Sequence, residues 1–287
     1  MRPWLHLARI SNLPTAWTNV TAAWLLAGGA LLDARLAWLI LAGSLIYTGG
    51  MILNDAADVK FDREHRKERP IPSGKVGVRT AWAVGGGMLF VGGTIALGKG
   101  ASPQITGLLL GAILFYDLYH KQWAGSVIIM GACRLLLYLM AASAVVPYSA
   151  AGPMLVLPYA IALGCYIVGI TLAARLEHKN AALPIPAAML AFALLYTPAV
   201  LCVMRFSSQG GSPLQLVVLG VVALLVAYAT HILRQGGPAI GKAVGWLLAG
   251  IALVDALAIS NVSVPLALCF VALTPLLRLW QRWVAAT

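Results

Sequence analysis

Long apolar runs separated by short polar stretches fill almost the whole of this 287-residue chain. Most runs have roughly the 20 residues that an α-helix needs to cross the hydrocarbon core of a bilayer. The pattern predicts ten membrane-spanning helices, near 13–32, 36–56, 80–98, 103–119, 123–146, 154–176, 184–204, 213–233, 240–260 and 264–283. The ninth run is broken up by glycines and by Asp255. We therefore expect an all-α, polytopic membrane bundle that forms a single domain over 1–287.

The lysine and arginine residues follow the same alternation. If the N-terminus is cytoplasmic, ten spans place nearly all of these bases on the cytoplasmic side and leave only Arg35, Lys99 and Arg205 opposite. A wrong number of spans would scramble this asymmetry, because cytoplasmic loops are the ones enriched in Lys and Arg. We therefore predict a multi-pass protein of the inner membrane with both termini on the cytoplasmic side.

Composition supports a membrane protein over a soluble one. Hydrophobic residues make up 61% of the chain and charged residues 10%, whereas charged residues are about a quarter of an average soluble domain. The net charge of +11 is explained by topology and by anionic lipid headgroups. No nucleic-acid-binding module is visible, so membrane lipids are expected partners and nucleic acid is not.

Glycines are frequent in the third apolar run. Gly85, Gly86, Gly87, Gly92 and Gly93 lie within it, without the Gly-Lys-Ser/Thr ending of a phosphate-binding loop. Small residues at such positions let helix backbones approach closely in membranes. We expect these glycines to pack helices together.

The stretch NDAADVKFDREHRKERPIPSG follows the second predicted span. Asn54, Asp58 and Asp62 are four residues apart, so they share one side of a helix, with Asp55 beside them. Carboxylates this close repel one another, and a divalent cation removes the conflict. Oxygen-only ligands suit Mg²⁺, which proteins usually hold through one or two carboxylates together with substrate phosphates. The stripe predicts a Mg²⁺ site and a phosphorylated ligand.

Bases follow the carboxylates directly. Arg63, Arg66, Lys67 and Arg69 are suited to phosphate oxygens, and arginine can bind them in a bidentate manner. The prolines and glycine of RPIPSG then turn the chain back toward the next span. An ordinary solvated loop would also collect bases on the cytoplasmic side, but it would not explain the ordered aspartates.

Other polar groups fall on the same side of the membrane. The fourth span ends at FYDLYHK, with Tyr116 and Lys121, and the sixth ends at ARLEHK, with Arg175 and Glu177. We expect both groups at the site, although Tyr and Lys also serve as interfacial anchors of membrane helices.

Arg134, Asn19 and Asp255 are among the polar residues inside the apolar runs. Arg134 is deep in the fifth span, where a charge costs about 2.5–3.5 kcal/mol. A structural salt bridge would satisfy Arg134, but we expect it to contact an anionic ligand or the aspartate cluster. Asn19 suits an interhelical hydrogen bond or a place in the lining of a substrate cavity. Asp255 fits a structural or a functional role equally well.

The NDAADVKFD run, the basic loop, RPIPSG and the Tyr/Lys element after the fourth span together resemble the UbiA superfamily of intramembrane prenyltransferases. The resemblance implies about nine helices around a central cavity, whose polar cap binds a prenyl diphosphate through Mg²⁺. Ionisation of the diphosphate would leave an allylic cation for a hydrophobic acceptor to attack. It also implies these positions: Asn54, Asp58 and Asp62 at the metal and diphosphate, Asp55 beside them, Arg69 and Lys121 at the diphosphate, and Tyr116 near the cation or acceptor.

The chain departs from the family pattern in its tenth span and at the end of span six. Family members usually carry a second aspartate-rich motif there, whereas TLAARLEHKN retains only Glu177, with Arg175 before it. YDLYHK and YIVGITLAARLEH resemble the divergent EboC-like branch. We predict a Mg²⁺-dependent prenyltransferase; a non-catalytic binder or carrier of prenyl diphosphate and a transporter of small anions are the alternatives.

Overall fold

The computed structural model describes residues 2–145, 152–175 and 185–284. All regular secondary structure within these ranges is helical, which confirms the predicted fold class. Seven spans in this part of the chain are long and apolar enough to cross a membrane. They are α3 (Ala34–Ala57), α5 (Val78–Gly98), α7 (Ser126–Ser143), α8 (Gly152–Ala174), α9 (Ile185–Gln209), α10 (Pro213–Leu233) and the joined pair α11 (Ala239–Ala249) and α12 (Ile251–Ile259).

Three further predicted spans contain shorter helices. These are α2 (Leu13–Leu26) with 14 residues, and α6 (Pro103–Tyr119) and α13 (Val264–Trp280) with 17 residues each. Each predicted apolar run therefore contains helix, and the interruption expected in the ninth run is the junction of α11 and α12 at Gly250. The remaining short elements are α1 (Arg2–Leu7), the 3₁₀ turn η1 (Ile10–Asn12) and α4 (Val59–His65).

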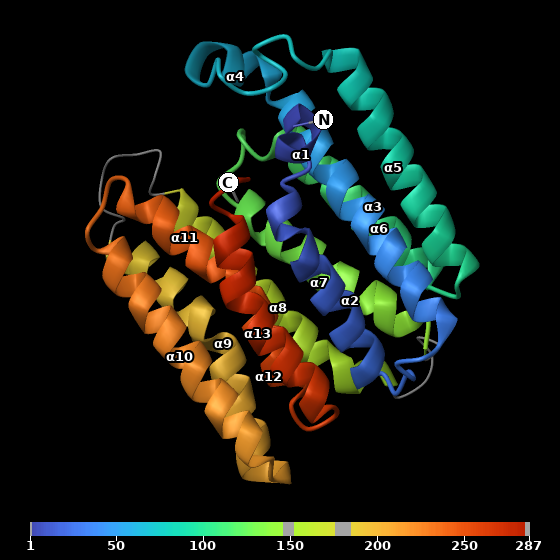
Figure 1. Cartoon of the computed structure of the whole chain (residues 1–287), viewed down its shortest axis with the longest axis vertical. Helices are drawn as coiled ribbons and strands as arrows, with labels where there is room; N and C mark the ends of the chain where they lie inside the picture. Colours follow the sequence, from blue (N-terminus) through green and yellow to red (C-terminus); the bar gives the residue numbers. More distant parts are fainter. Residues whose placement is uncertain (1, 146–151, 176–184, 285–287) are drawn as a thin grey trace.

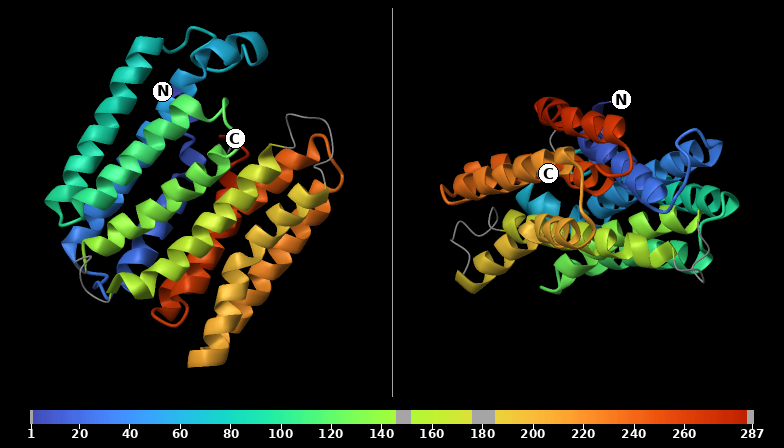
Figure 2. Two further views of the ribbon diagram at one scale, coloured as in Figure 1. Left: turned by 180° about the vertical axis from the view of Figure 1, so that it is seen from behind. Right: turned by 90° about the horizontal axis from the view of Figure 1, so that it is seen from below.

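The long helices lie side by side along the length of the molecule, and α4 lies at one end, beyond the end of α3 (Figures 1 and 2). Helix α3 packs on α5, α7 on α8, and α8 on α9. Helix α2 contacts α3, α7 and α12, so the beginning and end of the chain meet. One large cluster of buried apolar side chains runs through these helices from Leu13 to Phe270. This packing brings α2, α3, α6 and α7 together beneath α4.

Close packing of α3 on α5 depends on glycine. A Cβ atom added at Gly92 would lie 2.9 Å from the carbonyl oxygen of Ala42, and one added at Gly85 would lie 2.7 Å from Leu53 Cγ. A Cβ at Gly93 would meet Leu110 at 3.0 Å. The predicted packing role is thus confirmed at these three positions. It is wrong for Gly86 and Gly87, where a Cβ would meet nothing within 4 Å.

This difference predicts opposite outcomes for two alanine substitutions. Gly92→Ala should lower the free energy of unfolding by about 1–3 kcal/mol, because the added methyl group meets the Ala42 backbone, which yields only if α3 and α5 separate. Gly86→Ala should be neutral or slightly stabilising, since alanine is the better helix former. Thermal unfolding of both variants in the same detergent measures the difference, and equal losses would contradict the packing argument.

Candidate active site

The predicted carboxylate stripe lies where α3 passes into α4. Asp58 is both the C-cap residue of α3 and the N-cap residue of α4. Its backbone N–H donates to the carbonyl of Asn54 at 3.0 Å, and the N–H of Asp62 donates to the carbonyl of Asp58 at 2.9 Å. Because the helical hydrogen-bond pattern continues through the junction, the three predicted ligands stay along one side. Asn54 and Asp62 are buried.

The basic loop folds back onto two of the carboxylates. Nη1 of Arg69 lies 2.9 Å from Oδ2 of Asp62 and 3.3 Å from Oδ1 of Asp55. The Arg69 side chain is 17% exposed and that of Asp62 2%. Charges buried this far depend strongly on their partners, because the lost hydration has to be replaced. Arg69 is therefore part of the cluster, and its contact with a diphosphate stays a prediction.

Arg9 is a member of the cluster that the sequence did not reveal. Its Nη2 lies 3.5 Å from Oδ1 of Asp55. Arg9 also has a φ of 42°, an uncommon left-handed conformation for a residue with a Cβ. In the sequence this base looks like one more cytoplasmic charge before the first span. Its contact joins positions 46 residues apart, since 55 − 9 = 46, and no local pattern signals it.

The end of α6 supplies partners for Asp58. Nζ of Lys121 lies 2.8 Å from Oδ1 of Asp58, and Nε2 of His120 lies 3.5 Å from Oδ2. Burial raises the pKa of Asp58, but the hydrogen bonds from His120 and Lys121 outweigh it, so the pKa lies below its usual value. Lys121 also lies over the Phe61 ring, 3.8 Å from its centroid. Asp58 is thus a carboxylate at neutral pH, held between α4 and α6.

Asp117 also belongs to the cluster, although no role was predicted for it within the FYDLYHK group. Nδ2 of Asn54 donates to its Oδ1 at 3.3 Å. Its Oδ2 is buried, and among the described residues it has no hydrogen-bond partner. Asp117 belongs to YDLYHK, one turn before Lys121, so its place on α6 was the available signal. A buried carboxyl oxygen without a partner is costly, so Oδ2 of Asp117 is available to a ligand.

Magnesium fits the donors of this cluster. No three His, Cys, Asp or Glu side chains in the described part of the chain are placed to hold a metal by themselves. Mg²⁺ does not need such a set, because waters and substrate phosphates complete its octahedral shell. Asn54, Asp58 and the unpaired oxygen of Asp117 offer only oxygen ligands of the type that Mg²⁺ prefers. These residues would hold the ion, with Asp62 beside them; Asp62 is paired with Arg69 as Asp58 is with Lys121, and the predicted role of Asp62 as a ligand stays a prediction.

The remaining predicted site residues make no ion pair with the carboxylates of the cluster among the described residues. Tyr116 is half-buried on α6, with its ring stacked on His120 at 4.9 Å between centroids. Arg63 is exposed on α4. Nη1 of Arg175 donates to the carbonyl of Ala124 at 2.6 Å, and Nη2 donates to Oγ of Ser126 at 2.7 Å. Arg175 therefore joins the end of α8 to the start of α7. Glu177 lies outside the described residues.

Arg134 and Asn19 form a separate network midway along the bundle. Nη1 of Arg134 donates to Oδ1 of Asn19 at 2.8 Å, and Nη2 donates to Thr15 Oγ1 at 3.1 Å. Asn19 in turn donates from Nδ2 to Oδ2 of Asp255 at 2.7 Å. The interhelical hydrogen bonds of Asn19 are confirmed. The expected contact between Arg134 and the aspartate cluster is wrong within the described residues, because α2 places Asn19 and Thr15 in its reach instead.

Comparison with known proteins identifies the family of this chain. The sequence profile of the UbiA prenyltransferase family matches residues 13–244. The chain belongs to this family. Among curated relatives, the digeranylgeranylglyceryl phosphate synthase of Metallosphaera sedula is 32% identical over 142 residues, covering 48% of this chain and 50% of that protein. The 4-hydroxybenzoate octaprenyltransferase of Methylibium petroleiphilum is 41% identical over 71 residues, covering 24% of this chain and 23% of that protein. These matches span half or less of the relatives' length.

Solved structures of UbiA homologues share the fold over nearly the whole chain. The apo structure from Aeropyrum pernix has a TM-score of 0.72 at 18% identity, covering 88% of this chain and 97% of that one. The Archaeoglobus fulgidus homologue bound to GPP and Mg²⁺ has a TM-score of 0.63 at 15% identity, covering 94% and 99%. At these identities the likeness establishes the UbiA fold.

Proposed function

We propose that this UbiA-family protein transfers a prenyl group from a prenyl diphosphate to a hydrophobic acceptor in the membrane, with Mg²⁺ as its cofactor. The observation that carries the proposal is the cluster of buried carboxylates and bases at the junction of α3 and α4. An unpaired oxygen of Asp117 lies within it. The Archaeoglobus fulgidus homologue of the same fold binds GPP and Mg²⁺, which supports the assignment.

In this proposal the bases of the cluster stabilise the leaving diphosphate. Mg²⁺, when bound, would neutralise negative charge on the diphosphate oxygens as a Lewis acid. Arg69 and Lys121 are already fixed beside the carboxylates, so they need little reorganisation to face developing charge. Tyr116, on the neighbouring helix α6, is proposed to lie near the allylic cation or the acceptor. The C1–O bond of the donor breaks and releases diphosphate, a bond from C1 to the acceptor forms, and the acceptor loses a proton.

The proposal includes the setting of the reaction. Residues 1–287 act as one integral membrane domain, with both termini and the mouth of the site on the cytoplasmic side. Gln281, just after α13, donates to Oδ1 of Asn12, three residues from Arg9, which supports placing both ends of the chain on the same side as the cluster. The EboC-like branch and the binding roles of Arg63, Arg134, Arg175 and Glu177 remain predictions.

A carrier that binds prenyl diphosphate without turnover is the second candidate. It is favoured by the sequence around Arg175, which stands where the family usually has its second aspartate-rich motif. In this structure the Arg175 guanidinium donates hydrogen bonds to Ala124 and Ser126. A transporter for small anions would need Arg134 exposed to a pathway, whereas its guanidinium donates to Asn19 and Thr15. The two candidate functions that remain are therefore a prenyltransferase and a carrier that binds prenyl diphosphate without turnover.

One experiment separates them. Purified protein in detergent is incubated with labelled geranylgeranyl diphosphate and candidate acceptors, with Mg²⁺ or with EDTA. We expect diphosphate release and a prenylated product with Mg²⁺, near-complete loss with EDTA, and recovery when Mg²⁺ is restored. Mg²⁺-dependent binding without release would favour the carrier. Absence of both binding and consumption in any divalent metal would overturn the assignment.

A further inference from the structure

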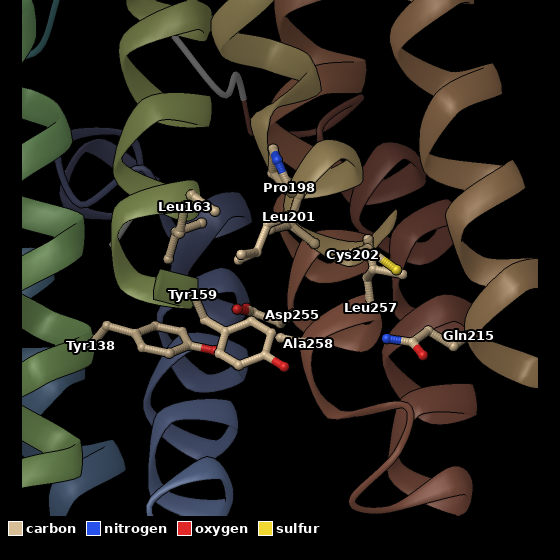
Figure 3. A pocket seen from close by; sticks show the side chains of 12 residues that line it. Tyr138, Tyr159, Leu163, Pro198, Leu201, Cys202, Gln215, Asp255, Leu257 and Ala258 are labelled. Atoms are coloured by element: carbon tan, nitrogen blue, oxygen red, sulfur yellow. The ribbon is translucent and has the colours of Figure 1, made fainter. Parts of the chain in front are cut away.

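A cavity beside Asp255, inside the bundle, is too small for a ligand larger than water. Tyr138 and Tyr159 border it together with Asp255, most of its other lining side chains are apolar, and its volume is about 20 Å³ (Figure 3). A cavity of this size holds about one water molecule. The charges of the C-terminal helices that lack an acidic partner lie elsewhere, at one end of the bundle.

Basic side chains collect where α10, α11 and α13 meet. Helix α10 packs on α11, and α11 contacts α13, with the end of α13 beside the start of α11 (Figure 1). Bases lie on these helices at that end: Arg234 just after α10, Lys242 in the first turn of α11, Arg278 in the last turn of α13 and Arg282 just beyond it. After position 177 the sequence has one acidic residue, Asp255, and its side chain is buried. Within the described ranges no salt bridge joins any of these bases to an acid.

Arg278 is held in place within this group of bases. Its Nη1 donates to Oε1 of Gln281 at 2.8 Å, and its guanidinium carbon lies 5.5 Å from the centroid of the Trp246 ring. A Cβ atom added at Gly245 would lie 2.6 Å from Nη1, so this glycine lets the guanidinium lie directly against α11. In the described part of the chain, Gln281 is the one hydrogen-bond partner of the Arg278 side chain. Since arginine has five N–H donors, most of them remain available to an anion.

Two more bases extend the positive surface around Arg278. Arg282 follows it four residues later and is exposed, and the two like charges repel each other. Lys242 is exposed on α11, one turn before Gly245 and Trp246. A bound anion would relieve the repulsion. A phosphate group also matches the guanidinium, which binds its oxygens in a planar, bidentate manner.

The side chains around these bases are typical of the edge of the hydrocarbon core. Trp246 makes a T-shaped contact with Tyr228 of α10, with 5.9 Å between ring centroids, and Trp and Tyr are enriched at the membrane–water interface. Farther from this end, α10 and α13 expose apolar side chains such as Leu224 and Leu276, which are 72% and 59% exposed. Acyl chains attached to a phosphate at Arg278 would therefore lie along the apolar surface of these helices.

We propose that Lys242, Arg278 and Arg282 form a binding site for the phosphate group of an anionic phospholipid of the surrounding membrane. Gly245 and Trp246 hold the guanidinium of Arg278, while Lys242 and Arg282 add the charge that favours an anionic over a zwitterionic headgroup. Basic pockets between membrane helices recognise acidic headgroups in this way. The site uses neither Mg²⁺ nor the carboxylate cluster, so it is independent of the proposed transfer reaction.

The test is native mass spectrometry of delipidated protein in a neutral detergent, titrated with lipid while EDTA is present. Phosphatidylglycerol is the probe, and phosphatidylcholine with the same acyl chains is the comparison lipid. We expect the wild type to bind phosphatidylglycerol about 10-fold or more tighter than phosphatidylcholine. Arg278→Gln should weaken phosphatidylglycerol binding about 10-fold, as the loss of a hydrogen bond between charged groups predicts. Equal affinity of the wild type for the two lipids would overturn the proposal.

Arg205→Gln is the matched control for Arg278→Gln. Arg205 is also half-buried against an aromatic ring, with its guanidinium carbon 4.9 Å from the Tyr159 centroid, but it belongs to α9. Its replacement removes the same charge and should leave phosphatidylglycerol binding unchanged. Lys121→Gln removes a base of the proposed diphosphate site and should also bind the lipid normally. A loss in Lys121→Gln as large as that in Arg278→Gln would place the lipid at the diphosphate site and contradict the inference.

A second variant keeps the test decisive if Arg278→Gln does not fold. The double variant Lys242→Gln/Arg282→Gln changes only exposed side chains and should bind phosphatidylglycerol about 10-fold more weakly. Wild-type affinity in this variant would contradict the site. Glycerophosphoglycerol, which has the headgroup without acyl chains, should not displace the lipid at equal concentration. Full displacement would indicate a site for a soluble phosphate compound and overturn the assignment to a lipid.

Discussion

Asp58→Asn is expected to lower kcat/KM for prenyl transfer at least about 100-fold, the loss typical of removing one electrostatic group from an active site. The substitution preserves size but removes the charge that holds Lys121 at 2.8 Å and His120 at 3.5 Å. It also removes one of the few carboxylates available to Mg²⁺. Initial rates with labelled geranylgeranyl diphosphate, over a range of Mg²⁺ concentrations, measure the loss. A higher Mg²⁺ requirement should accompany it.

Asp33→Asn is the matched control for this substitution. Asp33 caps the opposite end of α3, where it accepts from the N–H of Arg35 and pairs with its guanidinium at 2.7 Å. Asparagine caps helices as well as aspartate does, so this variant should retain near wild-type activity and stability. Equal activity of the two variants would contradict a role for Asp58 in the reaction.

Local spacing explains why much of the fold and part of the site could be predicted. Apolar runs located each membrane helix, since bilayer crossing imposes a length and composition that the sequence displays directly. Helix ends were less accurate. The run predicted to 32 ends as α2 at Leu26, because Gly28 takes a φ of 90° just after it, a frequent way for helices to stop. The hydropathy of a stretch of about 20 residues is an average, so a single glycine that ends a helix changes it little.

The partners in the site were harder to predict than its ligands. The four-residue spacing of Asn54, Asp58 and Asp62 is local, so helical geometry alone places them together. Arg9, in the turn between α1 and η1, and Asp117, on α6, reach the cluster from other segments, and only tertiary packing determines those contacts. Arg134 shows the same limit, because its burial in a span was evident but its partner on α2 was not.

Arg69→Gln is expected to destabilise the protein by about 3 kcal/mol, the lower end of the cost of breaking a buried ion pair. Arg69 bridges Asp55 and Asp62, and its loss leaves two carboxylates without that partner at the α3–α4 junction. Arg9 remains near Asp55 only, at 3.5 Å, so Asp62 bears most of the effect. Thermal unfolding in detergent should show a drop of several degrees, and diphosphate binding should weaken with it.

Two comparisons make the cause of that drop specific. Arg63→Gln removes the same charge from an exposed position on α4 and should change stability by no more than about 0.5 kcal/mol. The double variant Arg69→Gln/Asp62→Asn should recover part of the loss, because a neutral amide tolerates burial without a cationic partner better than a carboxylate does. Equal effects of the two arginine substitutions would contradict a buried ion pair. Recovery would also show that the stability lost in Arg69→Gln comes mainly from the pair that Arg69 forms with Asp62. The basic loop would then stabilise the carboxylates before any metal or diphosphate binds.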